Sequence, residues 1–288
     1  MYALLSLLGG VFVSVMLVLN GKLTAVTGVY LGTVIIHAVG LVLMLLWTLA
    51  RRGFRKLDKD VPIWSYCGGA IGVGTVVLVN LAFGTISVTA VVALSLFAET
   101  AVSILIDTFG WLGTQRRPFS LGGLWGLLVI CGGILVMLLP MKGASVLAVL
   151  FAMLSGVTNL FSRTVNSTLA RRSDSLYSTF WNFLTGFLAA LLVWAVLGCD
   201  LPARGLPTTF WYYLGGACGI GSVSLAALCL KKLSSFYVTL FTFIGQLFTS
   251  ILLDALLEGA FSLRSLTGGL LVLAGLILNL LAERRAKA

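Results

Sequence analysis

Ten long apolar runs, separated by short polar stretches, follow one another along the chain. They fall at roughly 2–19, 27–49, 62–83, 86–106, 121–140, 145–162, 176–198, 209–230, 236–256 and 265–282. Most approach the ~20 residues that a helix needs to cross a hydrocarbon core of ~30 Å. The runs are continuous and lack the alternation of barrel strands, and backbone polar groups in lipid must be bonded within the membrane-spanning element. The pattern therefore predicts an all-α membrane protein with ten transmembrane helices.

The chain also contains an internal repeat. Residues 66–107 align without a gap on residues 213–254, and 15 of these 42 positions are identical. Matching residues outside this window extend the repeat to two halves, 1–141 and 142–288, joined at Met141-Lys142-Gly143. Each half holds five predicted helices. Because five is odd, the second half enters the membrane from the opposite face, so we expect two inverted repeats, an arrangement that recurs in secondary transporters.

Basic residues are distributed unequally between the two sides of this predicted topology. The loops on the side of the N-terminus hold fifteen Lys and Arg residues, whereas the opposite loops hold four. In membrane proteins the cytoplasmic loops carry the excess of basic residues. The distribution therefore predicts a multi-pass protein of the inner (plasma) membrane with both termini in the cytoplasm. The net charge of +10 is therefore explained by topology, with contact to anionic lipids as a secondary effect, and nucleic-acid binding is excluded.

A polar stripe lies inside the fourth predicted helix of each half. Its members share a spacing of four residues, which places them along one helix face, and they are Ser95, Glu99, Ser103 and Asp107 in the first half and Thr242, Gln246, Ser250 and Asp254 in the second. We interpret Ser95, Thr242, Ser103 and Ser250, together with Glu99 and Gln246, as candidate substrate- or proton-binding residues. For Gln246, Ser103 and Ser250 a role in packing is equally consistent with the sequence.

Glu99 is the one charge in the middle of either stripe. A carboxylate deep in the bilayer costs roughly 2.5–3.5 kcal/mol on insertion scales, so packing alone does not favour it over glutamine. Glu99 is therefore either protonated or exposed to a wet cavity, and both states suit a site for a proton or a cationic substrate. The alternative is a hydrogen-bonded interior glutamate without function. Asp107 and Asp254 are expected at helix ends, bonded to the following loop or acting in gating.

Three further polar residues lie within or beside the apolar runs. His37 is the single histidine, which can titrate or line a cavity but is also consistent with a packing partner. Asn182 has an apolar counterpart in the first half, and this asymmetry favours a place in the wall of a substrate pocket. Arg163 is interpreted as an interfacial charge that extends toward the membrane surface.

Segments around both stripes resemble a known family. They are Glu99–Phe109 with Gly113 and Arg117-Pro118-Phe119-Ser120-Leu121, and Gly245-Gln246 through Asp254 with Phe261-Ser262-Leu263. They resemble the YdcZ-like branch of the drug/metabolite transporter superfamily, over the whole chain and in its fused two-half form. The family pattern has Gln at both stripe positions, so Glu99 departs from it, and the second half lacks Phe-Gly after Asp254. The resemblance implies a ten-helix inner-membrane transporter, often labelled an exporter.

The sequence therefore predicts a secondary active transporter that exports a small organic metabolite or drug-like compound by alternating access, with proton exchange at Glu99. Its expected partners are a small-molecule substrate, the lipid bilayer and protons, and both a monomer and a homodimer are open. The alternative is a non-transporting membrane scaffold or a lipid-scrambling protein. An enzyme is not expected because nucleophile–base, metalloprotease and nucleotide-binding motifs are absent, and the five cysteines lack the spacing of a metal site, so no metal or cofactor is expected.

Overall fold

The computed structural model describes residues 1–50, 61–83, 85–109, 121–138, 145–197, 201–202, 205–230, 232–233, 235–258 and 262–285. The first half contains α1 (Tyr2–Thr27), α2 (Val29–Ala50), the 3-10 turn η1 (Ile63–Tyr66), α3 (Gly68–Ala82), α4 (Val88–Phe109) and α5 (Leu121–Leu138). The second half contains α6 (Val146–Arg172), α7 (Ser175–Val196), η3 (Phe210–Leu214), α8 (Gly215–Cys229), α9 (Ser235–Glu258) and α10 (Leu263–Arg285). Within these ranges all the long elements are α-helices, which confirms that the protein is all-α.

Eight of the described segments are long and apolar enough to cross a membrane. The third span of each half consists of a 3-10 turn that leads into a helix, Ile63–Ala82 and Phe210–Cys229, where the apolar runs had predicted one continuous helix. The remaining two, α5 and α10, contribute the shorter apolar stretches Leu124–Met137 and Leu263–Asn279. The described residues therefore contain ten long helices or helical spans, of which eight are candidate membrane spans by length and composition; that all ten cross the membrane remains a prediction.

The bundle has an apolar outside, and its interior holds many polar side chains beside its apolar core. Large apolar residues such as Leu4, Trp47, Leu192 and Leu252 are more than half exposed on its outside. Its interior contains many hydroxyl, amide and acidic groups, among them Ser14, Asn20, His37, Thr89, Glu99, Ser155, Asn166, Ser178, Asn182 and Asp254. An apolar exterior of this extent is typical of a surface that lipid covers, since lipid chains are as apolar as leucine.

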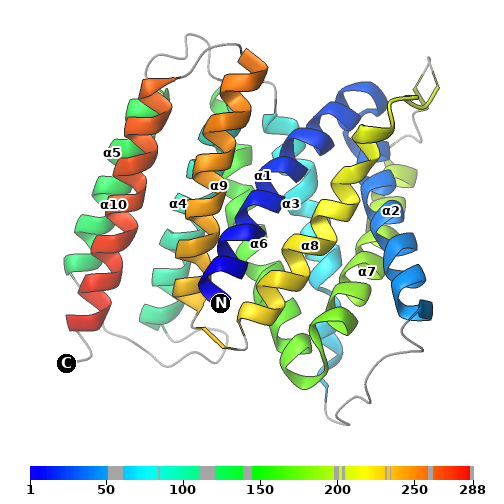
Figure 1. Cartoon of the computed structure of the whole chain (residues 1–288), viewed down its shortest axis with the longest axis horizontal. Coiled ribbons are helices and arrows are strands. Elements are labelled where there is room, and N and C mark those ends of the chain that lie inside the picture. Colours follow the sequence, from blue (N-terminus) through cyan, green and yellow to red (C-terminus); the bar gives the residue numbers. More distant parts are fainter. Residues whose placement is uncertain are drawn as a thin grey trace.

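The helices pack in pairs that correspond between the halves. α1 packs on α9 as α6 packs on α4, and α1 packs on α8 as α6 packs on α3. Two large contacts join equivalent helices, α5 with α10 at one edge of the bundle and α2 with α7 at the other (Figure 1), and α3 packs on α7 as α8 packs on α2. In the same view α1 begins and α10 ends on the same side of the bundle. Each helix therefore contacts helices of the other half, so the two sequence repeats form one structural unit.

Two glycines let the central helices approach closely. A Cβ atom at Gly10 of α1 would overlap the carbonyl oxygen of Thr242 in α9, and a Cβ atom at Gly156 of α6 would overlap the carbonyl oxygen of Ser95 in α4. Small residues at such positions allow helix backbones to meet in membranes. A third glycine, Gly28, has a φ of 80° and ends α1 one residue before α2 begins. Gly10 and Gly156 thus hold α9 and α4, which carry the polar stripes, against α1 and α6.

Several features of the sequence prediction lie outside the described residues. They include the connection Met141-Lys142-Gly143, the segment 110–120 with Arg116 and Arg117, all the basic residues of the 51–60 loop, and the side chain of Asp107. The orientation of the termini toward the cytoplasm and the division into 1–141 and 142–288 remain predictions.

Candidate functional site

A cavity of about 220 Å³ lies in the centre of the bundle. Its described lining comes from α1, α2, α3 and α4 of the first half and from α6, α7, α8 and α9 of the second. Neither α5 nor α10 contributes a described residue, since these two helices pack against each other at the edge (Figure 1). The cavity is therefore built at the junction of the two sequence repeats.

The cavity contains a buried ion pair. Arg163 of α6 donates from Nη2 to Oε1 of Glu99 in α4, and the side chains are only 17% and 8% exposed. The same nitrogen donates to Oγ1 of Thr239 in α9, at 2.8 Å, and Asn159 Nδ2 donates to Oε2 of Glu99 at 3.2 Å. Glu99 is therefore neither isolated nor dependent on water for its charge balance. A salt bridge and an amide together compensate its removal from water.

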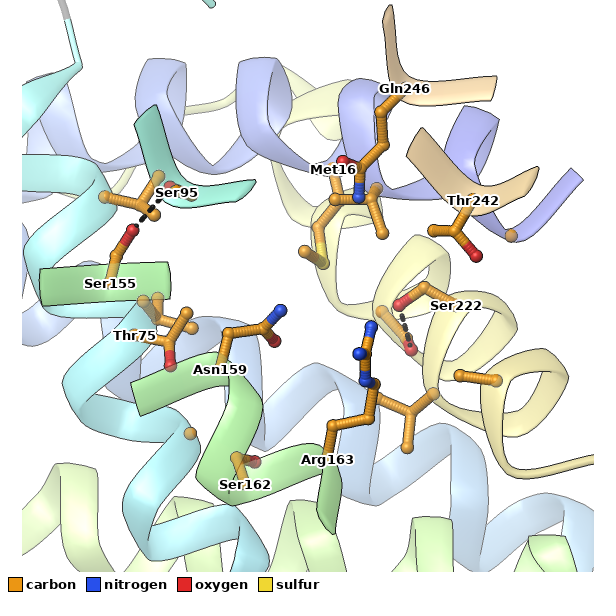
Figure 2. Close-up of a pocket in the computed structure, with 18 of the residues that line it drawn as sticks. Met16, Thr75, Ser95, Ser155, Asn159, Ser162, Arg163, Ser222, Thr242 and Gln246 are labelled. Atoms are coloured by element: carbon orange, nitrogen blue, oxygen red, sulfur yellow. Dashed lines mark hydrogen bonds between the residues drawn. The ribbon is translucent and has the colours of Figure 1, made fainter. Parts of the chain in front are cut away.

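Arg163 belongs to a polar face of α6 that continues beyond the ion pair. The members of this face recur every three or four residues, as one side of a helix requires, and they are Ser155, Asn159, Ser162, Arg163 and Asn166. Asn166 Nδ2 donates to Oδ1 of Asn182 at 2.7 Å, which extends the network to α7. Figure 2 shows Asn159 and Arg163 entering the cavity from α6, with Gln246 and Thr242 on a separate helix beyond them. One wall of the cavity is therefore a continuous strip of hydrogen-bonding groups.

The equivalent wall in α1 is mainly apolar. At the offset of the repeat, Asn159, Ser162 and Arg163 correspond to Val13, Met16 and Leu17, and all six residues line the cavity. Likewise Glu99 corresponds to Gln246. The charged pair Glu99 and Arg163 thus has the uncharged pair Gln246 and Leu17 at its repeat positions. The backbone is repeated, but the chemistry of the two walls differs.

The structure brings six of the candidate site residues to the cavity. Glu99, Ser95, Gln246, Thr242, His37 and Asn182 all line it. Ser95 Oγ is bonded to the carbonyl oxygen of Ala152 and lies 2.8 Å from Ser155 Oγ, so it joins α4 to α6. His37 Nδ1 lies 2.9 Å from the carbonyl oxygen of Thr33, and its ring packs against Phe183 with 6.0 Å between centroids. The stripes therefore point into the cavity through their first two members.

The later members of the stripes lie elsewhere. Neither Ser103 nor Ser250 is among the described residues that line the cavity, and Ser250 is fully buried with its hydroxyl bonded to Leu247 of its own helix. Asp254 is buried and bonds to the start of α4: Oδ1 accepts from Val88 N at 3.0 Å, and Oδ2 accepts from Thr89 N at 2.9 Å and from Thr89 Oγ1 at 2.6 Å. The bonds of Asp254 thus cross to the other half, where the sequence suggested bonds to the following loop.

The interpretation of Arg163 as an interfacial charge is wrong, because its guanidinium lies in the cavity on Glu99. The sequence held a signal for this position. The polar residues 155, 159, 162, 163 and 166 share one helix face, which a solitary charge near the membrane surface does not require. Among the residues that the structure describes, no cluster of His, Cys, Asp and Glu has the arrangement of a metal site.

Comparisons with known proteins agree with this architecture. The family model described as "Putative inner membrane exporter, YdcZ" matches residues 1–136 and 147–278. No curated protein matches the chain. A solved structure described as "Crystal structure of protein" is similar with a TM-score of 0.66 over 98% of each chain, at 18% identity, which establishes a shared fold alone.

The family match covers both halves of the repeat and includes every described residue of the cavity lining. It agrees with the lipid-facing exterior and with a multi-pass inner-membrane location. The chain belongs to the YdcZ family, which its description, "Putative inner membrane exporter, YdcZ", places in the inner membrane.

Proposed function

We propose that this protein is a secondary active transporter that exports a small organic compound by alternating access. The observation that carries the proposal is the central cavity, which four helices of each half enclose and which holds the Glu99–Arg163 ion pair. Transporters built from repeats bind substrate at the junction of the repeats, and a buried ionisable residue in a membrane protein marks such a pathway.

The pairing of the helices supports the proposal that the halves are inverted repeats. When the two halves are exchanged, the contact of α1 with α9 becomes that of α6 with α4, and the contacts α5–α10 and α2–α7 are unchanged. A chain with this property has two related arrangements of similar energy, in which the halves exchange roles. Rocking between them opens the cavity to one side and then to the other. The basic loops place both termini on the cytoplasmic side.

We assign the coupling role to Glu99, through its partner. While Glu99 is ionised it occupies the Nη2 atom of Arg163. A proton on Glu99 removes the negative charge that Arg163 and a cationic group of the substrate would both use, so proton and substrate compete for this side chain, as exchange requires. Asp254 has the gating role in this scheme, because it joins α9 of the second half to the first turn of α4 in the first.

Flux through purified protein tests the proposal. We expect proteoliposomes loaded with a mixture of cellular metabolites to release at least one small organic compound, faster when a pH gradient is imposed, as measured by mass spectrometry of the external medium. Protein-free liposomes provide the background. Scrambling of a fluorescent phospholipid without metabolite release would instead identify a lipid-scrambling protein, and the absence of both activities would identify a scaffold.

A further inference from the structure

The geometry points to a substrate class: a small zwitterion that carries a carboxylate, an ammonium group and an apolar body, bound between Arg163 and Glu99. This inference rests on the proposed function, because it names what the transport site recognises. It follows from three properties of the cavity, namely its charge balance, the unused hydrogen-bonding atoms of the ion pair, and the chemical difference between its two long walls.

The charge balance of the cavity is zero. Apart from the neutral His37, the ionisable side chains among its described lining residues are Glu99 and Arg163, one of each sign. A substrate with a net charge would leave one buried charge without a counter-charge, and breaking a buried pair in this way costs about 3–5 kcal/mol. A zwitterion brings both signs, so each partner keeps an opposite charge whether the pair opens or stays closed.

Arg163 has hydrogen-bonding atoms to spare. Both of its bonds, to Glu99 and to Thr239, use the Nη2 atom, whereas Nε and Nη1 have no partner among the described residues and are not enclosed by protein atoms. The guanidinium carries five N–H donors, and the two on Nη2 are the ones in use. The N–H groups of Nε and Nη1 in the cavity wall therefore remain as charged donors for the substrate carboxylate.

Glu99 has the complementary capacity. Each of its oxygens accepts one bond, from Arg163 and from Asn159. An ionised carboxylate has about four lone-pair sites, so two remain for an ammonium group. Because Glu99 and Arg163 are in direct contact, the two complementary charges of the substrate must be separated by only a few bonds. A carboxylate and an ammonium group on the same or adjacent carbon atoms meet this condition.

The opposite wall specifies the rest of the molecule. Val13, Met16 and Leu17 of α1 stand at the repeat positions of Asn159, Ser162 and Arg163, and Phe183 and Phe243 add aromatic surface to the same cavity. A substrate with a charged end on α4 and α6 places its remaining atoms against these side chains. Burial of an aliphatic or aromatic group there contributes roughly 25 cal/mol per Å² of apolar area. An apolar α-amino acid has all three features.

Calorimetric titration of the purified full-length protein tests this assignment. The probes are L-leucine and L-phenylalanine as zwitterions, their N-acetyl derivatives, which keep only the carboxylate, their amides, which keep only the ammonium group, and glycine, which lacks the apolar body. We expect the zwitterions to bind and the removal of either charge to weaken binding by about tenfold or more, the usual effect of losing a charged hydrogen bond. Glycine should bind more weakly than leucine.

A double variant gives the test a structural readout. Glu99→Gln with Arg163→Leu reproduces the residues that the chain carries at Gln246 and Leu17, so it leaves no buried charge unpaired. It should lose the preference for zwitterions over their derivatives, whereas Ser250→Ala, outside the cavity, should keep it. Retention of the preference in the double variant, equal binding of the derivatives, or no binding of either zwitterion would overturn the assignment. Metabolite release with none of these probes bound would leave the transporter proposal standing, and zwitterion binding without any flux would contradict that proposal alone.

Discussion

Replacing Arg163 with leucine is expected to lower the free energy of unfolding by about 3–5 kcal/mol, because it leaves the carboxylate of Glu99 buried without its partner. Glu99 is 6% exposed, and its remaining hydrogen bond would come from Asn159 at 3.2 Å. Glu99→Gln is expected to be harmful as well, since the guanidinium would keep a full charge beside a neutral amide. Each single change harms the residue that it leaves behind, so the stabilities of Glu99 and Arg163 are coupled.

The double variant Glu99→Gln with Arg163→Leu is expected to recover most of this loss. The wall formed by α4 and α6 would then carry the same residues as Gln246 and Leu17 in the wall formed by α9 and α1, which the fold already accommodates. Unfolding of the four proteins in one detergent gives the coupling energy of the double-mutant cycle. Additive losses, with the double variant less stable than either single variant, would show that the pair does not act as a unit.

Replacing Asp254 with alanine is expected to lower the free energy of unfolding by about 3 kcal/mol. The carboxylate accepts three hydrogen bonds from the first turn of α4, where the backbone N–H groups of Val88 and Thr89 have no partner within their own helix. These two donors lie in the interior, so truncation leaves them unsatisfied. The carboxylate also lies at the positive end of the dipole of α4, which adds to its stabilising effect.

Two further variants separate this capping contact from general packing at the end of α9. Asp254→Asn keeps one acceptor oxygen and is expected to lose roughly half as much stability. Ser250→Ala, one turn earlier on the same helix, removes only a bond to the carbonyl oxygen of Leu247 and is expected to be close to neutral. Thermal unfolding in detergent measures all three variants. Equal losses for Asp254→Ala and Ser250→Ala would assign the effect to packing of α9 instead.

The repeat allowed much of this architecture to be predicted from the sequence. Apolar length predicted every helix because lipid removes the alternatives to regular backbone structure. The matched stripes predicted that α4 and α9 face a common interior through Ser95, Glu99, Thr242 and Gln246, and all four line the cavity. When a polar residue recurs at the same place in both halves, the shared fold gives both copies equivalent surroundings, so its placement can be predicted from the repeat.

Arg163 was missed for the converse reason. Its counterpart in the first half is Leu17, so the comparison of the halves gave it no support, and its charge alone suggested a place at the membrane surface. The charge of Glu99 can be balanced by solvent or by a cation, and the choice depends on how α4 packs on α6. This packing is set by the contact of Gly156 with the backbone of Ser95. Such a contact between distant segments has no periodicity in the sequence. The same holds for the bonds of Asp254 to Val88 and Thr89.

The central claim is that one cavity between the two halves opens to each face of the membrane in turn, and two-sided labelling tests it most directly. Ser222 of α8 lines the cavity, and Ser222→Cys supplies a reporter there in a chain whose five native cysteines have been replaced. We expect a membrane-impermeant maleimide to modify it in right-side-out and in inverted vesicles alike, whereas a cysteine at the fully buried Ser250 reacts in neither. Modification of Ser222→Cys from one face only, or from neither, would contradict alternating access through this cavity.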